Sequence, residues 1–218
     1  MNALPRAQGP YDGDIYTRII QSLRDQGYCV VSDFLPTDLI QSLFIDIKKL
    51  DNSHFKTAAI GRHDNVLVNR FVRGDRICWV DEDNTSVKSY LDWIESLRLR
   101  INRELYLGLF DFECMYAHYP EGAFYKKHYD AFQGESNRKL SVILYLNPAW
   151  QHHDGGELVV YDKHDNIIEK VTPTFGKMVI FLSEEFPHEV LATHRSRYSL
   201  TGWFRINNTS GITLDPPA

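Results

Sequence analysis

The sequence contains little cysteine. It has three cysteines in 218 residues, Cys29, Cys78 and Cys114, and no two of them form a C-x-x-C pair. This spacing matches neither a zinc knuckle nor the disulfide framework of a small secreted protein. We therefore expect reduced thiols and a cytoplasmic protein.

Long apolar runs, basic runs and internal repeats are absent as well. No stretch of 18 apolar residues exists, and the N-terminal MNALPRAQGPYDGD has no apolar core of the signal-peptide kind. Lys and Arg never occur in runs longer than two, and the net charge is −5. Because phosphate backbones bind to basic surfaces, these features disfavour nucleic acid and membranes as partners.

The residues that are present suffice for one well-packed domain. Hydrophobic residues make up 43% of the chain and aromatic residues 13%. Residues 1–13 are rich in Pro and Gly, so we expect a loose N-terminal segment followed by a single domain over 14–218. A monomer is expected.

The domain divides into a helical layer and a β region. Between 14 and 107, apolar spacing predicts helices over 14–27, after Pro36 and from about Ser86 to Leu107. From about 110 to 208, strand-like runs separated by turn residues replace the helical period: FECMYAHY, KLSVILYLN, ELVVYD, KMVIFL and SLTGWFRI. The sequence predicts a mainly β protein with α, a jelly roll whose N-terminal helices pack on one sheet.

Two His-x-Asp patterns are candidates for metal binding, His128-Tyr129-Asp130 and His152-His153-Asp154. Residues i and i+2 of a strand point to the same face, so either pattern can direct an imidazole and a carboxylate inward. A third ligand has to come from a distant strand, and His188 and His194 are the candidates.

The order of residues favours His128, Asp130 and His188. Nine residues after His188, Arg197 opens a strand that has a polar face: Arg197, Ser199, Thr201 and Trp203. The Arg fork matches a carboxylate, and two His with one carboxylate form the facial triad of Fe(II) oxygenases. We therefore predict an iron site with Arg197 holding the far carboxylate of 2-oxoglutarate. The other pattern precedes Gly155-Gly156 and is expected to be a solvated turn, and His194 is expected to be exposed.

These residues resemble the 2-oxoglutarate/Fe(II) prolyl 4-hydroxylases, and in particular the oxygen-sensing branch of the hypoxia-factor hydroxylases and their bacterial members. Residues 66–206 carry the resemblance, in these segments: RGDRICW, MYAHYPEGAFYKKHYD, LYLNPAW with DGGEL, FPHEV and RYSLTGW. The resemblance implies a double-stranded β-helix, Fe(II), 2-oxoglutarate and O2 as reactants, and ascorbate as reductant.

The resemblance also implies roles for further residues. Tyr145, Tyr119 and Thr201 would line the 2-oxoglutarate pocket with Arg197. Another set would shape a groove for a proline-containing protein: Arg73, Asp75, Arg138 and Trp203. Among bacterial members, elongation factor Tu is the associated protein substrate. The loop 54–65 differs from the animal hydroxylases, so substrate identity stays open.

Several alternatives remain at this point. The tyrosines also fit an aromatic core, and Arg73-Gly74-Asp75 also fits a turn closed by a local ion pair. The chain could act on a small molecule or a nucleobase instead of a prolyl residue. It could also be a metal-holding jelly-roll sensor without turnover, although such a module has no need of Arg197 with Tyr145.

Overall fold

The structure, a computed structural model, describes residues 14–51, 53–57, 72–131 and 137–207. Its helices are α1 (Ile15–Gln26), α2 (Thr37–Lys49) and α3 (Thr85–Leu105), close to the predicted positions. The Asp14 side chain caps α1 by accepting from the Thr17 N–H, and α1 ends at Gly27, whose φ of 77° lies in the left-handed region. The segment 1–13 and most of the loop 54–65 lie outside the described residues.

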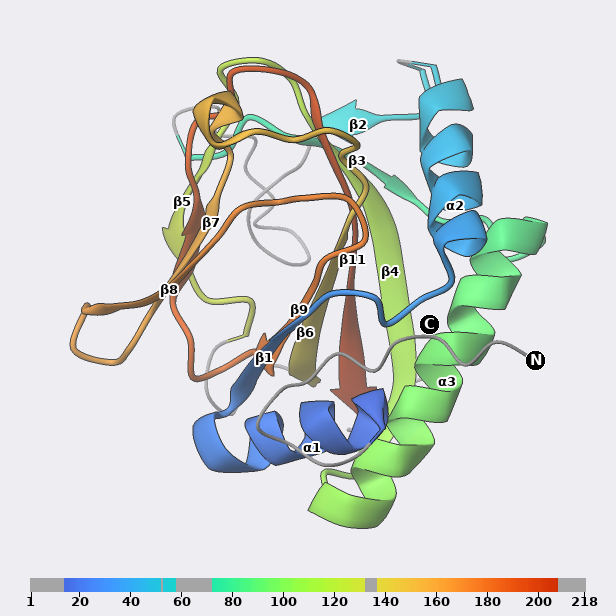
Figure 1. Cartoon of the computed structure of the whole chain (residues 1–218), viewed down its shortest axis with the longest axis vertical. Coiled ribbons are helices and arrows are strands. Elements are labelled where there is room, and N and C mark those ends of the chain that lie inside the picture. The colour runs from blue at the N-terminus through green and yellow to red at the C-terminus, as the bar shows by residue number, and fades with distance from the viewer. Residues whose placement is uncertain (1–13, 52, 58–71, 132–136, 208–218) are drawn as a thin grey trace, which may run out of the picture.

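The described strands form two antiparallel sheets on opposite sides of one interior (Figure 1). The larger sheet has the order β1 (Tyr28–Val31), β9 (Met178–Leu182), β6 (Arg138–Tyr145), β11 (Arg197–Ile206), β4 (Leu109–Tyr119), β3 (Arg76–Trp79) and β2 (Lys56–Thr57). The smaller sheet has the order β5 (Tyr125–His128), β10 (His188–Val190), β7 (Leu158–Tyr161) and β8 (Ile167–Val171). The predicted jelly roll with helices on one sheet is confirmed.

Each central strand of the larger sheet contributes to two separate cores. On β6, Leu140, Val142 and Leu144 pack against the helices, whereas Ile143 and Tyr145 face the smaller sheet. The strand period of two places alternate side chains on opposite faces of the sheet. The space between the sheets is therefore lined by every second residue of β4, β6, β9 and β11.

The strand β11 brings a polar row into that space. It pairs with β4 and β6 along most of its length, with Arg197 opposite Tyr119 and Ser199 opposite Tyr145. On its other face, a Cβ added at Gly202 would lie 2.4 Å from the Phe112 ring and 2.6 Å from a backbone oxygen of β4. Only glycine fits there, so the close pairing of β11 with β4 depends on the missing side chain.

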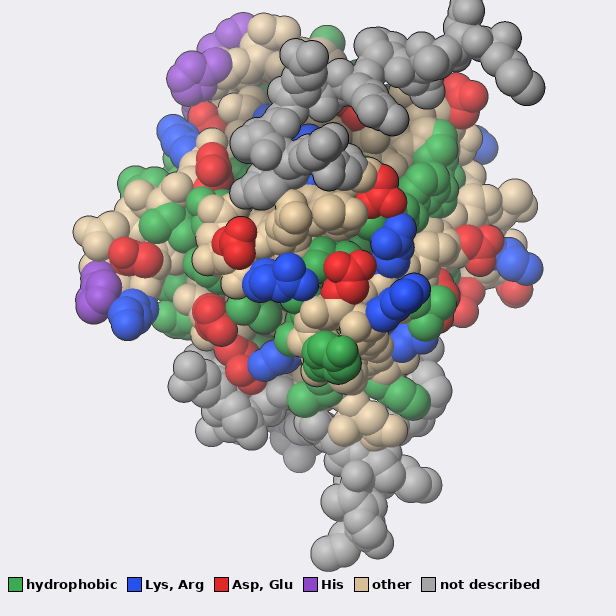
Figure 2. Space-filling view, turned by 60° about the horizontal axis from the view of Figure 1, so that its bottom comes forward, with side chains coloured by type: hydrophobic (Ala, Val, Ile, Leu, Met, Phe, Trp, Pro, Cys, Tyr) green, Lys and Arg blue, Asp and Glu red, His purple; other side chains and the backbone are tan. Residues whose placement is uncertain are grey.

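Within the described ranges, no helix combines the length and hydrophobicity needed to cross a membrane. On the face shown in Figure 2, basic and acidic side chains of the described residues are interspersed. A nucleic-acid backbone requires a continuous basic surface, which this face does not offer.

Candidate active site

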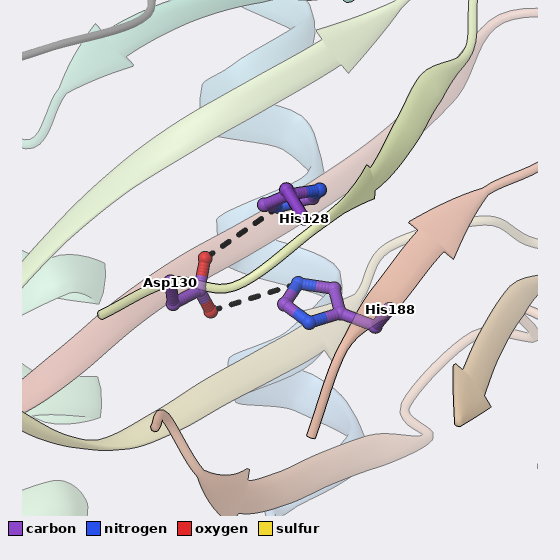
Figure 3. Close-up of side chains that lie close together, drawn as sticks. All are labelled: His128, Asp130 and His188. Carbon is purple, nitrogen blue, oxygen red and sulfur yellow. Dashed lines mark ion pairs between the residues drawn. The ribbon is translucent and has the colours of Figure 1, made fainter. Parts of the chain in front are cut away.

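Three side chains meet between the two sheets (Figure 3). His128 ends β5, Asp130 follows it by two residues, and His188 opens the neighbouring strand β10, directly opposite His128. The Asp130 Oδ1 lies 3.7 Å from His128 Nε2, and its Oδ2 lies 3.7 Å from His188 Nε2. One ligand atom from each residue lies within 4.8 Å of the others, a spacing at which one metal ion can bind all three.

Backbone carbonyls orient both imidazoles. Nδ1 of His128 lies 2.8 Å from the Lys126 carbonyl oxygen, and Nδ1 of His188 lies 3.1 Å from that of Phe186. A carbonyl can only accept, so each Nδ1 carries the proton and donates it. In the neutral form of each ring, Nε2 then carries the lone pair and points toward Asp130, which is the tautomer that binds a metal.

The protonation states also suit metal binding. Burial, together with the neighbouring His128, lowers the pKa of His188 to about 4, so this imidazole is neutral near pH 7. Burial acts to raise the pKa of Asp130, but the two histidines and the Ser141 hydroxyl outweigh it and hold the pKa well below its usual range. A carboxylate and a neutral imidazole are the forms that metal ions bind.

Aromatic and cation–π contacts connect His128 to Tyr125 and Arg73. The Tyr125 ring stacks on the His128 ring with centroids 3.5 Å apart, and the Arg73 guanidinium lies over the Tyr125 ring at 4.3 Å. Arg73 donates to both oxygens of Asp75 at 2.7 and 2.6 Å, and Asp75 is buried. The local ion pair that the sequence allowed is therefore present, and it lies one ring away from His128.

Arg197 lies deeper in the same interior and is 1% exposed. Its Nε donates to the Gly156 carbonyl at 2.9 Å, and the rings of Tyr119 and Tyr145 lie about the guanidinium at 4.8 and 5.1 Å. In the described part of the chain, no carboxylate forms an ion pair with it. A buried cation is costly without an anion, so this site is suited to a carboxylate ligand.

Tyr145 strengthens that conclusion. Its side chain is fully buried, and its hydroxyl makes no well-formed hydrogen bond with a described residue; the adjacent Arg197 can only donate, so the Tyr145 proton lacks an acceptor there. Burial raises its pKa to about 12 against the opposing charge of Arg197, so the hydroxyl stays protonated and able to donate. A buried donor without an acceptor is rare in proteins and points to a ligand oxygen beside Arg197.

Of the remaining predicted residues, Thr201 and Trp203 lie on β11 and Arg138 opens β6. Thr201 Oγ1 lies 3.2 Å from the Ser199 hydroxyl, and Trp203 is 4% exposed. The Arg138 guanidinium lies 3.6 Å over the Trp203 ring and donates from Nε to Glu113 at 2.7 Å. Arg138 and Trp203 are thus in contact, whereas Arg73 and Asp75 lie on the Tyr125 side of the site.

The other His-x-Asp pattern does not reach this interior. His152 and His153 are exposed on a short 3-10 helix, and His194 is exposed as predicted. The expectation of a wholly solvated turn is wrong for Asp154, which is 7% exposed. Its carboxylate accepts from the Gln151 N–H at 2.7 Å and closes the helix as a capping box, so it is buried to hold the backbone.

Two serines contact the site although sequence reasoning did not select them. Ser141 on β6 donates to Asp130, and Ser183, just after β9, lies 2.9 Å from Ser141. Both stand in apolar runs, where a small hydroxyl gives no distinctive pattern. The signal that could have identified them is a serine in or next to an apolar strand, because a hydroxyl buried there needs a hydrogen-bond partner.

Comparison with known proteins decides the family. A crystal structure of a prolyl-4-hydroxylase from Pseudomonas putida is 39% identical in sequence, with a TM-score of 0.81, over 89% of this chain and 100% of that chain. This chain belongs to the 2OG-Fe(II) oxygenase superfamily. Residues 114–205 match the superfamily's conserved region, which contains the candidate ligands and Arg197. Membership implies Fe(II), 2-oxoglutarate and O2 as cofactor and co-substrates.

Animal relatives of this oxygenase are prolyl hydroxylases too. A prolyl hydroxylase from Trichoplax adhaerens, solved with a peptide of hypoxia inducible factor, is 29% identical with a TM-score of 0.77, over 88% of this chain and 89% of that one. The hypoxia-inducible factor prolyl hydroxylase of Caenorhabditis elegans is 27% identical over 87% of this chain. The chain spans 28% of that protein and 45% of human Egl nine homolog 1.

Proposed function

We propose that this oxygenase hydroxylates C4 of a prolyl residue in a protein substrate. The observation that carries the proposal is the presence, in one interior, of a three-residue metal site and a buried Arg197 that forms no ion pair with any described carboxylate. A metal-holding sensor has no use for a buried cation beside the metal, whereas a 2-oxo acid needs both. The similarity to the Pseudomonas putida prolyl-4-hydroxylase supports the prolyl substrate.

His128, Asp130 and His188 would hold Fe(II). Three protein ligands leave open positions for a bidentate 2-oxo acid and for O2. The neutral imidazole of His188 and the ionised carboxylate of Asp130 described above suit a divalent cation.

Arg197 and Tyr145 would bind the distal carboxylate of 2-oxoglutarate. The Arg197 fork and the Tyr145 hydroxyl supply donors from two buried side chains, and Tyr119 and Thr201 would form the walls of the binding pocket. This anchoring fixes the other end of the 2-oxo acid at the metal, because the pocket lies in the same interior as the three ligands.

When bound, iron would activate O2 at the expense of 2-oxoglutarate and supply the oxidant for a C–H bond. The overall reaction balances with one oxygen atom in the new hydroxyl and the other in succinate, and with CO2 as the second product. The protein's residues would position the reactants and exclude water. Ascorbate would serve as a reductant that keeps iron in the Fe(II) state.

Arg138, Trp203, Arg73 and Asp75 would shape the peptide groove. Arg138 and Trp203 contact each other across the neighbouring strands β6 and β11. Asp75 would act through Arg73, because its own carboxylate is buried and paired. We further propose a monomeric, cytoplasmic enzyme, and the free cysteines fit a reducing compartment.

The test uses purified elongation factor Tu, which the resemblance to bacterial members makes the first candidate substrate. It is incubated with the chain, Fe(II), ascorbate, 2-oxoglutarate and air, and then mapped by tryptic mass spectrometry. The expected result is one added oxygen on a proline, absent without 2-oxoglutarate and absent with His128→Ala. Comparison with an authentic 4-hydroxyproline peptide assigns the carbon.

The other outcomes separate the alternatives. Succinate formation without a modified proline would refute elongation factor Tu but retain the oxygenase, and would direct the search to other peptides or small molecules. Neither product, from a folded protein that binds Fe(II), would favour the sensor and overturn the proposal.

A further inference from the structure

The inner face of β6 carries one polar side chain close to the metal ligands. Ser141 is fully buried, and the next inward residue, Ile143, is apolar and packs in the core between the sheets. A hydroxyl at such a position costs free energy unless it is hydrogen-bonded. The hydrogen-bond partners of Ser141 therefore indicate the role of this residue.

Those partners form a chain of two hydroxyls that ends on Asp130. Ser141 Oγ lies 2.6 Å from Asp130 Oδ2 and 2.9 Å from Ser183 Oγ, and Ser183 is fully buried too. An ionised carboxylate can only accept, so Ser141 donates its single proton to Asp130. Ser183 must then be the donor to Ser141, and the two bonds polarise each other in one direction.

The two serines are fixed by the larger sheet. Ser141 pairs with Phe181 across β6 and β9, and the Ser183 N–H donates to the Lys139 carbonyl at 3.0 Å. Asp130, in contrast, follows the end of β5 in the smaller sheet. The hydrogen bond to Ser141 thus connects a metal ligand on one sheet to a rigid point on the other.

This connection sets Asp130 apart from the two histidines. Each imidazole is oriented by a carbonyl only two residues before it in the chain. The hydroxyl that donates to Asp130 lies 11 residues later in the chain, on a different sheet. The orientation of the carboxylate therefore depends on how the two sheets are assembled, and not on local backbone geometry.

We propose that Ser141, itself oriented by Ser183, is a positioning residue that makes Asp130 a one-oxygen ligand. This inference rests on the metal site of the proposed function. Both carboxylate oxygens lie 3.7 Å from an imidazole Nε2, but only Oδ2 accepts from Ser141, so this bond would weaken Oδ2 as a ligand and favour binding of the metal through Oδ1. Without it, the carboxylate is free to rotate or to bind through both oxygens, which would take a position that a 2-oxo acid needs.

The experiment compares metal binding by folded variants, with Co(II) as the probe. Calorimetry gives the dissociation constant, and the visible absorption of bound Co(II) reports its coordination number. The variants are Ser141→Ala, Ser183→Ala and Ser141→Thr, which keeps the hydroxyl. Ser22→Ala is the matched control, because Ser22 is also a buried serine but lies in α1, away from the site.

Losing an outer partner of a metal ligand typically weakens metal binding about 10- to 100-fold, and we expect this for Ser141→Ala together with an altered Co(II) spectrum. Ser183→Ala should weaken binding less, because the Ser141 donor remains but turns more freely. Ser141→Thr should restore the wild-type spectrum, and Ser22→Ala should match wild type in both readings.

Two results would overturn the proposal, and they can be told apart. If wild type binds Co(II) and Ser141→Ala binds it with the same affinity and spectrum, the positioning role is wrong while the metal site stands. If folded wild type does not bind Co(II), the proposed function fails and this inference fails with it. If Ser141→Ala does not fold, the Ser183→Ala variant tests the proposal, because it interrupts the same chain of hydrogen bonds one residue farther from Asp130.

Discussion

The two His-x-Asp stretches of this chain share one sequence pattern but have different structural roles. His128 and Asp130 stand where β5 ends and meet His188 from the neighbouring strand, inside the molecule. His152 and His153 stand on a 3-10 turn with their rings in solvent, and Asp154 turns inward to cap the backbone. The comparison shows that a ligand pair is defined by the strand that carries it and by what faces that strand.

Matched histidine variants should separate the two stretches most strongly. His128→Ala removes one of three predicted ligands, so metal affinity should fall by about 100-fold or more and turnover to background. His153→Ala removes an exposed ring and should leave both unchanged. Co(II) titration and succinate formation measure the two effects. If both variants lost metal affinity and turnover equally, the conclusion that only the first stretch binds the metal would be wrong.

Two arginines that stand two residues apart give the next comparison. Arg197→Lys keeps the charge and loses the fork, and a lost charge-assisted hydrogen bond of about 1.5–3 kcal/mol corresponds to about 10- to 100-fold in KM for 2-oxoglutarate. Arg195 instead donates to the Pro148 carbonyl at 2.8 Å, near Asp154. Arg195→Lys should therefore leave KM within about 2-fold of wild type.

The cap at Asp154 should affect stability without affecting chemistry. Asp154→Ala leaves the Gln151 N–H without its acceptor, and the loss of such a cap costs about 1–2 kcal/mol in the free energy of unfolding. Urea unfolding measures this cost, and succinate formation per folded molecule should not change. A fall in that specific activity would mean that the turn communicates with the metal site.

The smallest effect concerns His118, which tests whether burial alone makes a histidine a ligand. Burial lowers its pKa, as it does for His188, but His118 stacks on Tyr198 at 4.6 Å and faces α2 instead of the metal site. Arg76 and Lys48 act in the same direction. Tyr198, Phe55 and the Ser196 hydroxyl also contact the ring.

The sign of its pH dependence follows from that lowered pKa. As pH falls below about 6.5, the unfolded chain takes up the proton first, so this contribution to stability is present at neutral pH and decreases under acid. His118→Phe keeps the stacking and cannot titrate. Its free energy of unfolding should fall less than that of wild type between pH 7 and pH 5, with metal affinity unchanged. Identical pH profiles would contradict this.

The sequence predicts the apolar strands, including the short β7, and misses a polar one. β4, β6, β7, β9 and β11 contain apolar runs that are strong enough to recognise. β5 reads Y-K-K-H, with both lysines exposed, so its pattern gives no sign of a strand. Such strands exist because a neighbour offers backbone hydrogen bonds, which is a property of the assembled sheet and not of the segment.

In the candidate site, too, the sequence predicts the residues with a local pattern and misses contacts that form only in the folded protein. The chain order of His128, Asp130, His188 and Arg197 is readable because each residue type is unusual at an inward strand position. The contact between Ser141 and Ser183 depends on the register of β6 against β9, and no local pattern records it. The burial of Asp154 was missed for a similar reason, since its partners become visible only when the turn is folded.

Gly202 limits how this enzyme can be re-engineered. Its empty side-chain position lets β4 approach β11, and any insertion or deletion in β11 would move a side chain into that gap and turn Arg197 away from the interior. Specificity can therefore be altered by exchanging inward residues one at a time. Changes in the length of this strand should abolish the pocket and the fold together.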